Sequence, residues 1–84
     1  MKNGIIHYRN TNKSLYVIKL DDGDYTVFEC VGPREFSVGH VVTGDLHTFG
    51  LKDIKNITTN KWVYVLIQNV GLTETVAIEK ANLR

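Results

Sequence analysis

The sequence predicts a small all-β barrel of five or six antiparallel strands. Its 84 residues suffice for one domain with a modest core, and 43% of them are apolar. Short apolar runs recur roughly every eight to twelve residues between turns rich in Gly, Asn and Asp, which is typical of small barrels. No window of useful length places apolar residues at helical spacing. We therefore expect a single β domain over residues 1–84.

The start of the chain predicts two strands joined by a tight turn. The first covers residues 4–10 and ends at Asn-Thr-Asn, where Asn tolerates a left-handed backbone. The second covers residues 14–20. Its residues Tyr16, Ile18 and Leu20 share one face, because successive side chains of a strand alternate. We assign this wholly apolar face to the core.

A hairpin and a third strand follow. Residues 21–24 read Asp-Asp-Gly-Asp, a strong hairpin signal because Gly adopts a positive φ without strain. The third strand covers residues 25–31. It ends before Pro33, because proline has no N–H to donate to a sheet.

The middle of the chain is less regular. Residues 40–46 predict a fourth strand, with Gly44 at a bulge or bend of the kind that barrel corners need. Residues 47–60 form the least regular stretch. Within it, residues 51–55 suit a single helical turn.

Two further strands complete the predicted barrel. Residues 61–68 make the most apolar strand, in which Trp62 and Tyr64 are expected in the core. A turn at residues 69–71 leads to a last strand at residues 73–80, with Val76 and Ile78 facing inward and Thr75, Ala77 and Glu79 facing outward. A five-stranded OB-type barrel and an SH3-like barrel are the two candidates at this length.

Charge restricts the class of partner. The formal net charge is +1, which argues against strong non-specific binding to duplex nucleic acid. Residues 1–20 carry four basic and no acidic side chains, whereas residues 21–45 carry six acidic side chains and one Arg. A basic surface would therefore come mainly from the first two strands.

The composition suits a cytoplasmic protein. The single cysteine cannot form an internal disulfide, which is compatible with a reducing compartment. No apolar run approaches the roughly 20 residues that span a bilayer. The first residues do not read as a signal peptide. We expect no membrane partner.

No pattern of catalytic or metal-binding residues is evident. The three histidines and Cys30 are the only soft metal ligands, and none has paired ligand spacing. No local motif places Cys30 beside a histidine and a carboxylate, as nucleophilic catalysis requires. Residues 21–24 carry three carboxylates, but the segment is too short for an EF-hand loop and lacks its terminal Glu. We expect neither an enzyme nor a bound metal or cofactor.

Three segments of the first half share their spacing with a known family. Residues 4–10 read GIIHYRN, residues 13–18 read KSLYVI and residues 27–30 read VFEC. They resemble the cold-shock domain, a small OB-fold that binds single-stranded RNA and DNA, whose motifs are G-x-V-K-W-F-N, K-G-F-G-F-I and V-F-V-H. A weaker match to a further motif of the family follows over residues 36–42, so the resemblance covers about half of the chain.

The resemblance implies a nucleic-acid-binding face on the first three strands, where rings stack with bases and basic side chains meet phosphates. Carried over position by position, the binding residues are His7, Tyr8, Arg9, Lys13, Leu15, Val17, Lys19, Phe28 and Cys30. Only Tyr8 and Phe28 keep an aromatic ring, and each lost stack removes ~1–3 kcal/mol. The resemblance therefore implies a non-enzymatic module with weak affinity for single-stranded RNA or DNA.

Two alternatives stay open. An outward Phe28, as in the family, would turn Glu29 into the barrel, whereas the opposite register buries Phe28 together with Cys30. The pair of Leu15 and Val17 would instead suit a protein partner or self-association on an OB-like barrel without nucleic-acid binding.

Overall fold

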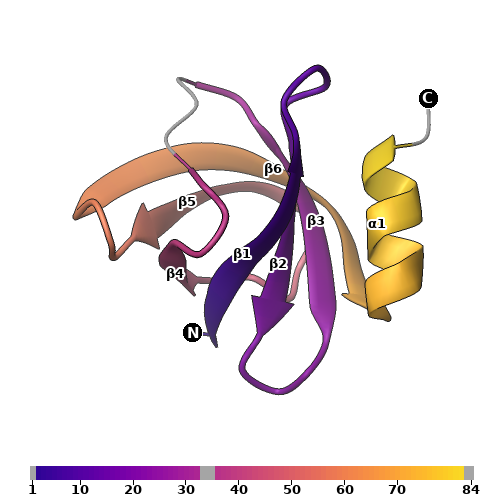
Figure 1. Ribbon diagram of the computed structural model, residues 1–84. Helices are drawn as coiled ribbons and strands as arrows, with labels where there is room; N and C mark the ends of the chain where they lie inside the picture. Colours follow the sequence, from indigo (N-terminus) through magenta and orange to yellow (C-terminus); the bar gives the residue numbers. More distant parts are fainter. Residues whose placement is uncertain (1, 33–35, 83–84) are drawn as a thin grey trace.

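Two three-stranded meanders make up the barrel. The computed structural model describes residues 2–32 and 36–82. The first meander consists of β1 (Lys2–Asn10), β2 (Leu15–Leu20) and β3 (Tyr25–Cys30). The second consists of β4 (Val41–Gly44), β5 (Gly50–Asn56) and β6 (Lys61–Leu72). β1 pairs with β4 and β3 with β6, so the sheet closes in the order β1-β2-β3-β6-β5-β4 (Figure 1). The predicted small antiparallel barrel is confirmed, and the described residues form six strands of it.

The β2–β3 hairpin forms at the predicted Asp-Asp-Gly-Asp turn. Gly23 has φ 95°, a conformation that only glycine adopts without strain. The Asp22 carboxylate accepts a hydrogen bond of 3.0 Å from the backbone N–H of Asp24, which closes the turn. β3 then runs to Cys30. The predicted strand end at Pro33 lies outside the described residues.

Three aromatic rings form the centre of the barrel. Phe28 stacks on Tyr16 with ring centroids 5.2 Å apart, and Phe36 meets both rings edge-on. Such pairs add about 0.5–1.5 kcal/mol beyond the apolar area they bury. Aliphatic side chains from β1, β2, β4, β5 and β6 and from the β4–β5 loop surround them: Ile6, Ile18, Leu20, Val42, Leu46, Ile54, Val63, Val65 and Ile67.

The register of β3 resolves the alternative left open by the sequence. Phe28 is fully buried, and Thr26 beside it donates its hydroxyl to the carbonyl oxygen of Leu46 at 2.9 Å. Glu29 faces outward, where it accepts a hydrogen bond from the Gln68 amide. The register that buries Phe28 is the one observed. The other register would turn the Glu29 carboxylate into the barrel, where it would lack a partner.

The strand predictions for the second half need correction. Residues 51–55 do not form a helical turn but lie within β5, and β6 continues through the predicted turn at 69–71. β4 is shorter than the predicted strand at residues 40–46. β5 lacks an apolar alternation because its barrel-facing Asn56 is polar. That side chain bonds the His40 ring at 2.9 Å instead of packing against carbon.

The last element is the helix α1 (Glu74–Asn82), so the predicted strand at residues 73–80 is wrong. Thr73 begins it by accepting the N–H of Val76 on its hydroxyl. Ala77 and Ala81, four positions apart, are the buried residues of the helix, whereas Val76 is 37% exposed. Two alanines give too small an apolar stripe for a helical periodicity, although Ala favours helix strongly. Among the described residues, no helix is long and apolar enough to cross a membrane.

Candidate functional site

The face of strands β1–β3 that the resemblance implied lies under α1 (Figure 1). Leu15 and Val17 point outward from β2, but they are 6% and 0% exposed because they pack against Ala77 and Ala81. Tyr25 and Val27 of β3 complete this second apolar cluster. The aliphatic patch expected for a partner is therefore already covered by the chain itself.

Two other predicted binding residues lie inside the barrel. Phe28 belongs to the aromatic centre, and Cys30 is 6% exposed. The Cys30 thiol donates a hydrogen bond to the carbonyl oxygen of Gly32 at 3.5 Å. Neither side chain presents a surface on which a base could stack.

Polar contacts with α1 engage the predicted residues of β1 and the following turn. A register shift at His7 brings Tyr8 beside Val17 on the outer face. His7 lies 2.6 Å from a Glu74 oxygen, and the Tyr8 hydroxyl donates to Asn82 at 3.1 Å. The Lys13 ammonium donates to the Asn82 carbonyl oxygen at 3.2 Å.

The remaining two predicted residues reach solvent. Arg9 donates to the Phe36 carbonyl oxygen at 3.0 Å, and Lys19 stands exposed on β2. Of the nine predicted residues, then, four are buried, three make polar contacts with α1 and two reach solvent. The structure therefore does not bring the nine residues together as an open platform, because five of them hold α1 in place and two more lie inside the barrel.

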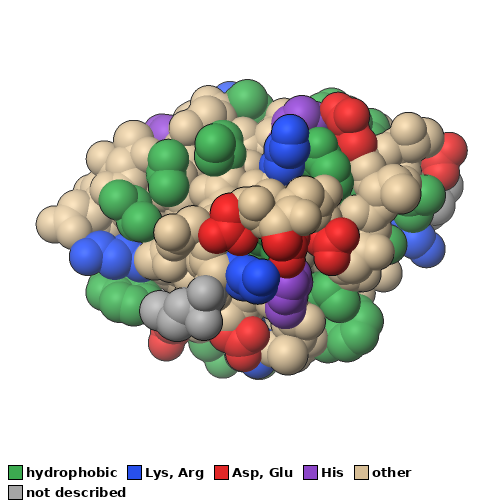
Figure 2. Space-filling view, turned by 90° about the horizontal axis from the view of Figure 1, so that it is seen from below, with side chains coloured by type: hydrophobic (Ala, Val, Ile, Leu, Met, Phe, Trp, Pro, Cys, Tyr) green, Lys and Arg blue, Asp and Glu red, His purple; other side chains and the backbone are tan. Residues whose placement is uncertain are grey.

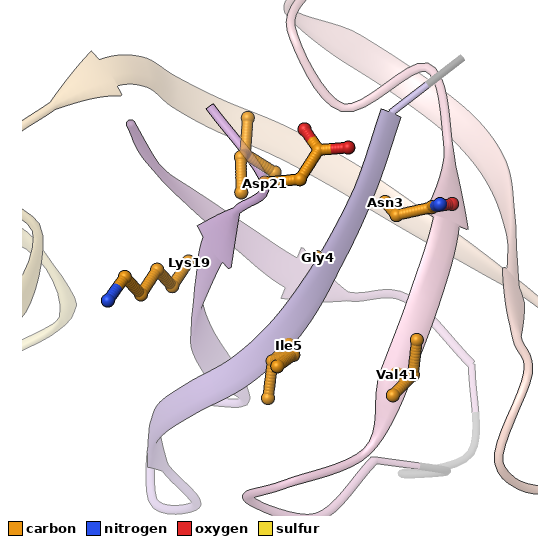
Figure 3. Close-up of a pocket in the computed structure, with 7 residues that line it drawn as sticks. Asn3, Gly4, Ile5, Lys19, Asp21 and Val41 are labelled. Atoms are coloured by element: carbon orange, nitrogen blue, oxygen red, sulfur yellow. The ribbon is translucent and has the colours of Figure 1, made fainter. Parts of the chain in front are cut away.

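An open groove of about 420 Å³ crosses β1 between β2 and β4 (Figure 3). It is lined by Asn3, Gly4, Ile5, Lys19, Leu20, Asp21 and Val41. The Lys19 side chain extends away from β1, whereas the Asp21 carboxylate points toward it. The polar groups therefore do not converge on one point, as small-molecule recognition requires.

The end of the barrel at the β2–β3 turn gathers opposite charges (Figure 2). One Asp22 oxygen lies 3.0 Å from the Lys2 ammonium and 3.2 Å from His47 Nε2. The hydrogen bond from the Asp24 N–H, and then Lys2, lower the pKa of Asp22 from its ordinary value. Asp22, Asp24 and His47 place ligand atoms within 4.8 Å of one another. Because Lys2 already neutralises Asp22, we assign this cluster the role of joining the hairpin to β1 and the β4–β5 loop.

The most exposed aromatic side chains of a strand lie elsewhere, on β6. Trp62 is 62% and Tyr64 45% exposed, so their predicted place in the core is wrong. Across the ladder, Trp62 pairs with Lys55 and Tyr64 with Asp53 of β5. We call the outward residues of these two strands the β5–β6 face: Leu51, Asp53, Lys55, Trp62, Tyr64 and Leu66.

Alternation along β6 produces this face. Val63, Val65 and Ile67 fill the barrel and are at most 5% exposed. The residues between them must then point outward, whatever their polarity. The sequence holds this signal as a run in which aromatic residues alternate with β-branched ones. This alternation is hard to recognise because all of the residues are apolar. A strand that is buried on both faces and a strand with an exposed apolar face give the same unbroken apolar run.

Comparison with known proteins yields no relative. No protein-family model matches the chain, and neither a curated protein nor a solved structure matches it significantly.

Proposed function

We propose that this chain is a small non-enzymatic binding module that recognises another protein through the β5–β6 face. The observation that supports the proposal is the exposure of Trp62 and Tyr64 side by side on a regular strand. Trp and Tyr are the residues most enriched at the energetic centres of protein interfaces. Burying such a ring in an interface would contribute about 25 cal/mol of binding free energy for each Å² of apolar area removed from water.

The charge of the face favours a protein over a nucleic acid. Lys55 and Asp53 are its charged residues and they cancel. Binding to phosphates requires several uncompensated cations. Leu51, 54% exposed, and Leu66 add aliphatic area that bases and phosphates would not use. Apolar and aromatic area with balanced charge is typical of a protein interface.

Single-stranded nucleic acid is a second candidate ligand, supported by a different observation. Trp62 and Tyr64 occupy alternate positions of one strand, with Lys55 beside the first ring. Successive bases could stack on the two rings, each for ~1–3 kcal/mol. Such binding would use the β5–β6 face rather than the strand β1–β3 face that the resemblance to cold-shock domains implied.

Position-specific photo-crosslinking in the expressing cell tests the proposal. A photoreactive phenylalanine analogue replaces Trp62 in one variant and Ile5, a half-exposed apolar residue of β1, in the matched control. We expect a discrete protein adduct from position 62 that disappears when Tyr64→Ser is added, and no such adduct from position 5. Mass spectrometry identifies the adduct.

Two outcomes contradict the proposal. A nucleic-acid adduct from position 62 would establish the second candidate instead. Equal adducts from positions 62 and 5, or none from either, would show that the β5–β6 face is not a specific interaction surface.

A further inference from the structure

The β5–β6 face has a regular pattern of side chains around one cross-strand pair. Ile54 of β5 lies opposite Val63 of β6, and both side chains are buried. The outward pair of Asp53 and Tyr64 lies on one side of it. The outward pair of Lys55 and Trp62 lies at the same distance on the other side.

Consider a twofold axis that lies in the plane of this face, runs perpendicular to the two strands and passes at the level of Ile54 and Val63. It would place complementary residues of two copies opposite each other. The rotation reverses the strand direction and lays β5 over β5 and β6 over β6. Asp53 then falls opposite Lys55 of the second copy, and Lys55 opposite its Asp53. Trp62 likewise falls opposite Tyr64 of the second copy. Each contact occurs twice, as an isologous interface requires.

Two exposed apolar residues, Leu51 within β5 and Ile57 directly after it, lie at equal sequence distances from the axis. Leu51 lies three positions before Ile54, and Ile57 lies three positions after it. They are 54% and 47% exposed. The axis at Ile54 brings Leu51 of one copy to the level of Ile57 of the other. Apolar contacts would thus flank the charge pairs on both sides.

We propose that the partner of the β5–β6 face is a second copy of this chain, bound about this axis; the inference rests on the proposed function. The balance of Asp53 and Lys55 supports a self-complementary partner, because each charge finds its opposite without a further residue. A standard interface takes about 800 Å² from each partner, and the whole chain exposes 4548 Å². A six-residue face on a convex barrel supplies less, so the dimer should be weak, with a Kd on the order of micromolar.

Charge-swap variants and sedimentation equilibrium test this dimer. Asp53→Lys places two lysines opposite two lysines, and Lys55→Asp places four carboxylates together. Each variant should raise the dimer Kd about 10-fold or more, because like charges across an interface repel. The double variant Asp53→Lys with Lys55→Asp restores both pairs and should dimerise like the wild type. An equimolar mixture of the two single variants should form a heterodimer. Glu79→Lys, an equal change on exposed helix α1, is the control and should leave the Kd unchanged.

The outcomes separate this inference from the proposed function. A wild type that stays monomeric at every concentration overturns the dimer, as do single variants that dimerise like the wild type. If the monomeric protein still gives a Tyr64-dependent adduct to a different protein from position 62, the binding face stands and only the second copy is wrong. If position 62 gives no adduct either, both proposals fail.

Discussion

Phe28 shows how a single side chain fixes which face of β3 is core. Its ring lies 5.2 Å from Tyr16 and 5.1 Å from Phe36, and it is fully buried. Phe28→Ala would leave a cavity between these rings and should lower the free energy of unfolding by about 3–5 kcal/mol. Urea denaturation measures this change. Val31→Ala, at a residue 54% exposed beyond β3, is the control and should stay within about 0.5 kcal/mol of the wild type.

Gly4 is required for space rather than for its backbone angles. A Cβ at this position would lie 2.4 Å from Ile18 Cγ2 and 3.1 Å from the Lys19 carbonyl oxygen. Gly4→Ala should therefore destabilise the barrel by about 1–3 kcal/mol through overpacking. Gly32→Ala has open space around the new methyl and serves as the control in the same denaturation series. Equal stabilities of the two variants would refute the close approach of β1 and β2.

Asp22 should contribute to the acid sensitivity of the protein. The Asp24 N–H and Lys2 lower its pKa in the folded state. The unfolded chain therefore binds more protons than the folded one below pH about 4, and stability falls as the pH drops toward the folded pKa. Asp22→Asn should make the unfolding curves less dependent on pH in that range. Asp21→Asn removes an equal charge from the same turn but keeps the contact of Asp22 with Lys2, and it is the matched control.

At the scale of the element, α1 acts as a cover for the apolar outer face of β2 and β3. Its buried contacts come from Ala77 and Ala81, and its ends are fixed by His7 with Glu74 and by Tyr8 with Asn82. With so little buried area of its own, the helix depends on the barrel for its stability.

Substitutions on the two faces of α1 should have opposite consequences. Ala77→Glu places a charge against Val17 and Val27 and should release the helix, at a cost of about 1–3 kcal/mol. Val76→Glu changes the exposed face and should leave the helix in place. Hydrogen exchange of the α1 amides and binding of a hydrophobic dye measure the release. Protected α1 amides in Ala77→Glu would contradict the packing of this helix.

The elements differ in how far the sequence could predict them. β2 and β3 combine a glycine turn with apolar alternation, and both were correctly predicted. β5 and α1 were missed because their buried sides carry a weak signal, with Asn56 facing the barrel in one and two alanines in the other. The local sequence pattern does not show that a strand is held by pairing with strands on both sides. Nor does it show that two alanines of a helix pack against an apolar sheet.

The candidate site escapes prediction for a related reason. The sequence predicts a core position for Trp62 because this residue lies within an apolar run. Whether the odd-numbered or the even-numbered residues of that run face inward depends on how the barrel closes around Val63 and Val65. Barrel closure is a long-range property of the sheet. The face of strands β1–β3, predicted from the resemblance to cold-shock domains, is occupied by a helix that the sequence pattern did not reveal.

On the scale of the whole molecule, the barrel has one covered and one open apolar side. α1 contacts β1, β2, β3 and β6, and among the described residues it does not contact β4 or β5 (Figure 1). The β5–β6 face therefore remains accessible while α1 is docked. A variant that releases α1, such as Ala77→Glu, should leave binding at Trp62 unchanged.

The fluorescence of Trp62 tests the central claim most directly, because this is the only tryptophan of the chain. In dilute solution its emission should be that of a water-exposed indole and should be quenched readily by acrylamide. As the protein concentration rises, the emission should shift to shorter wavelength and quenching should weaken in the wild type, but not in Asp53→Lys, which keeps the indole. Emission of a buried indole at high dilution, or exposed emission at every concentration, would contradict an open β5–β6 face that binds a second copy.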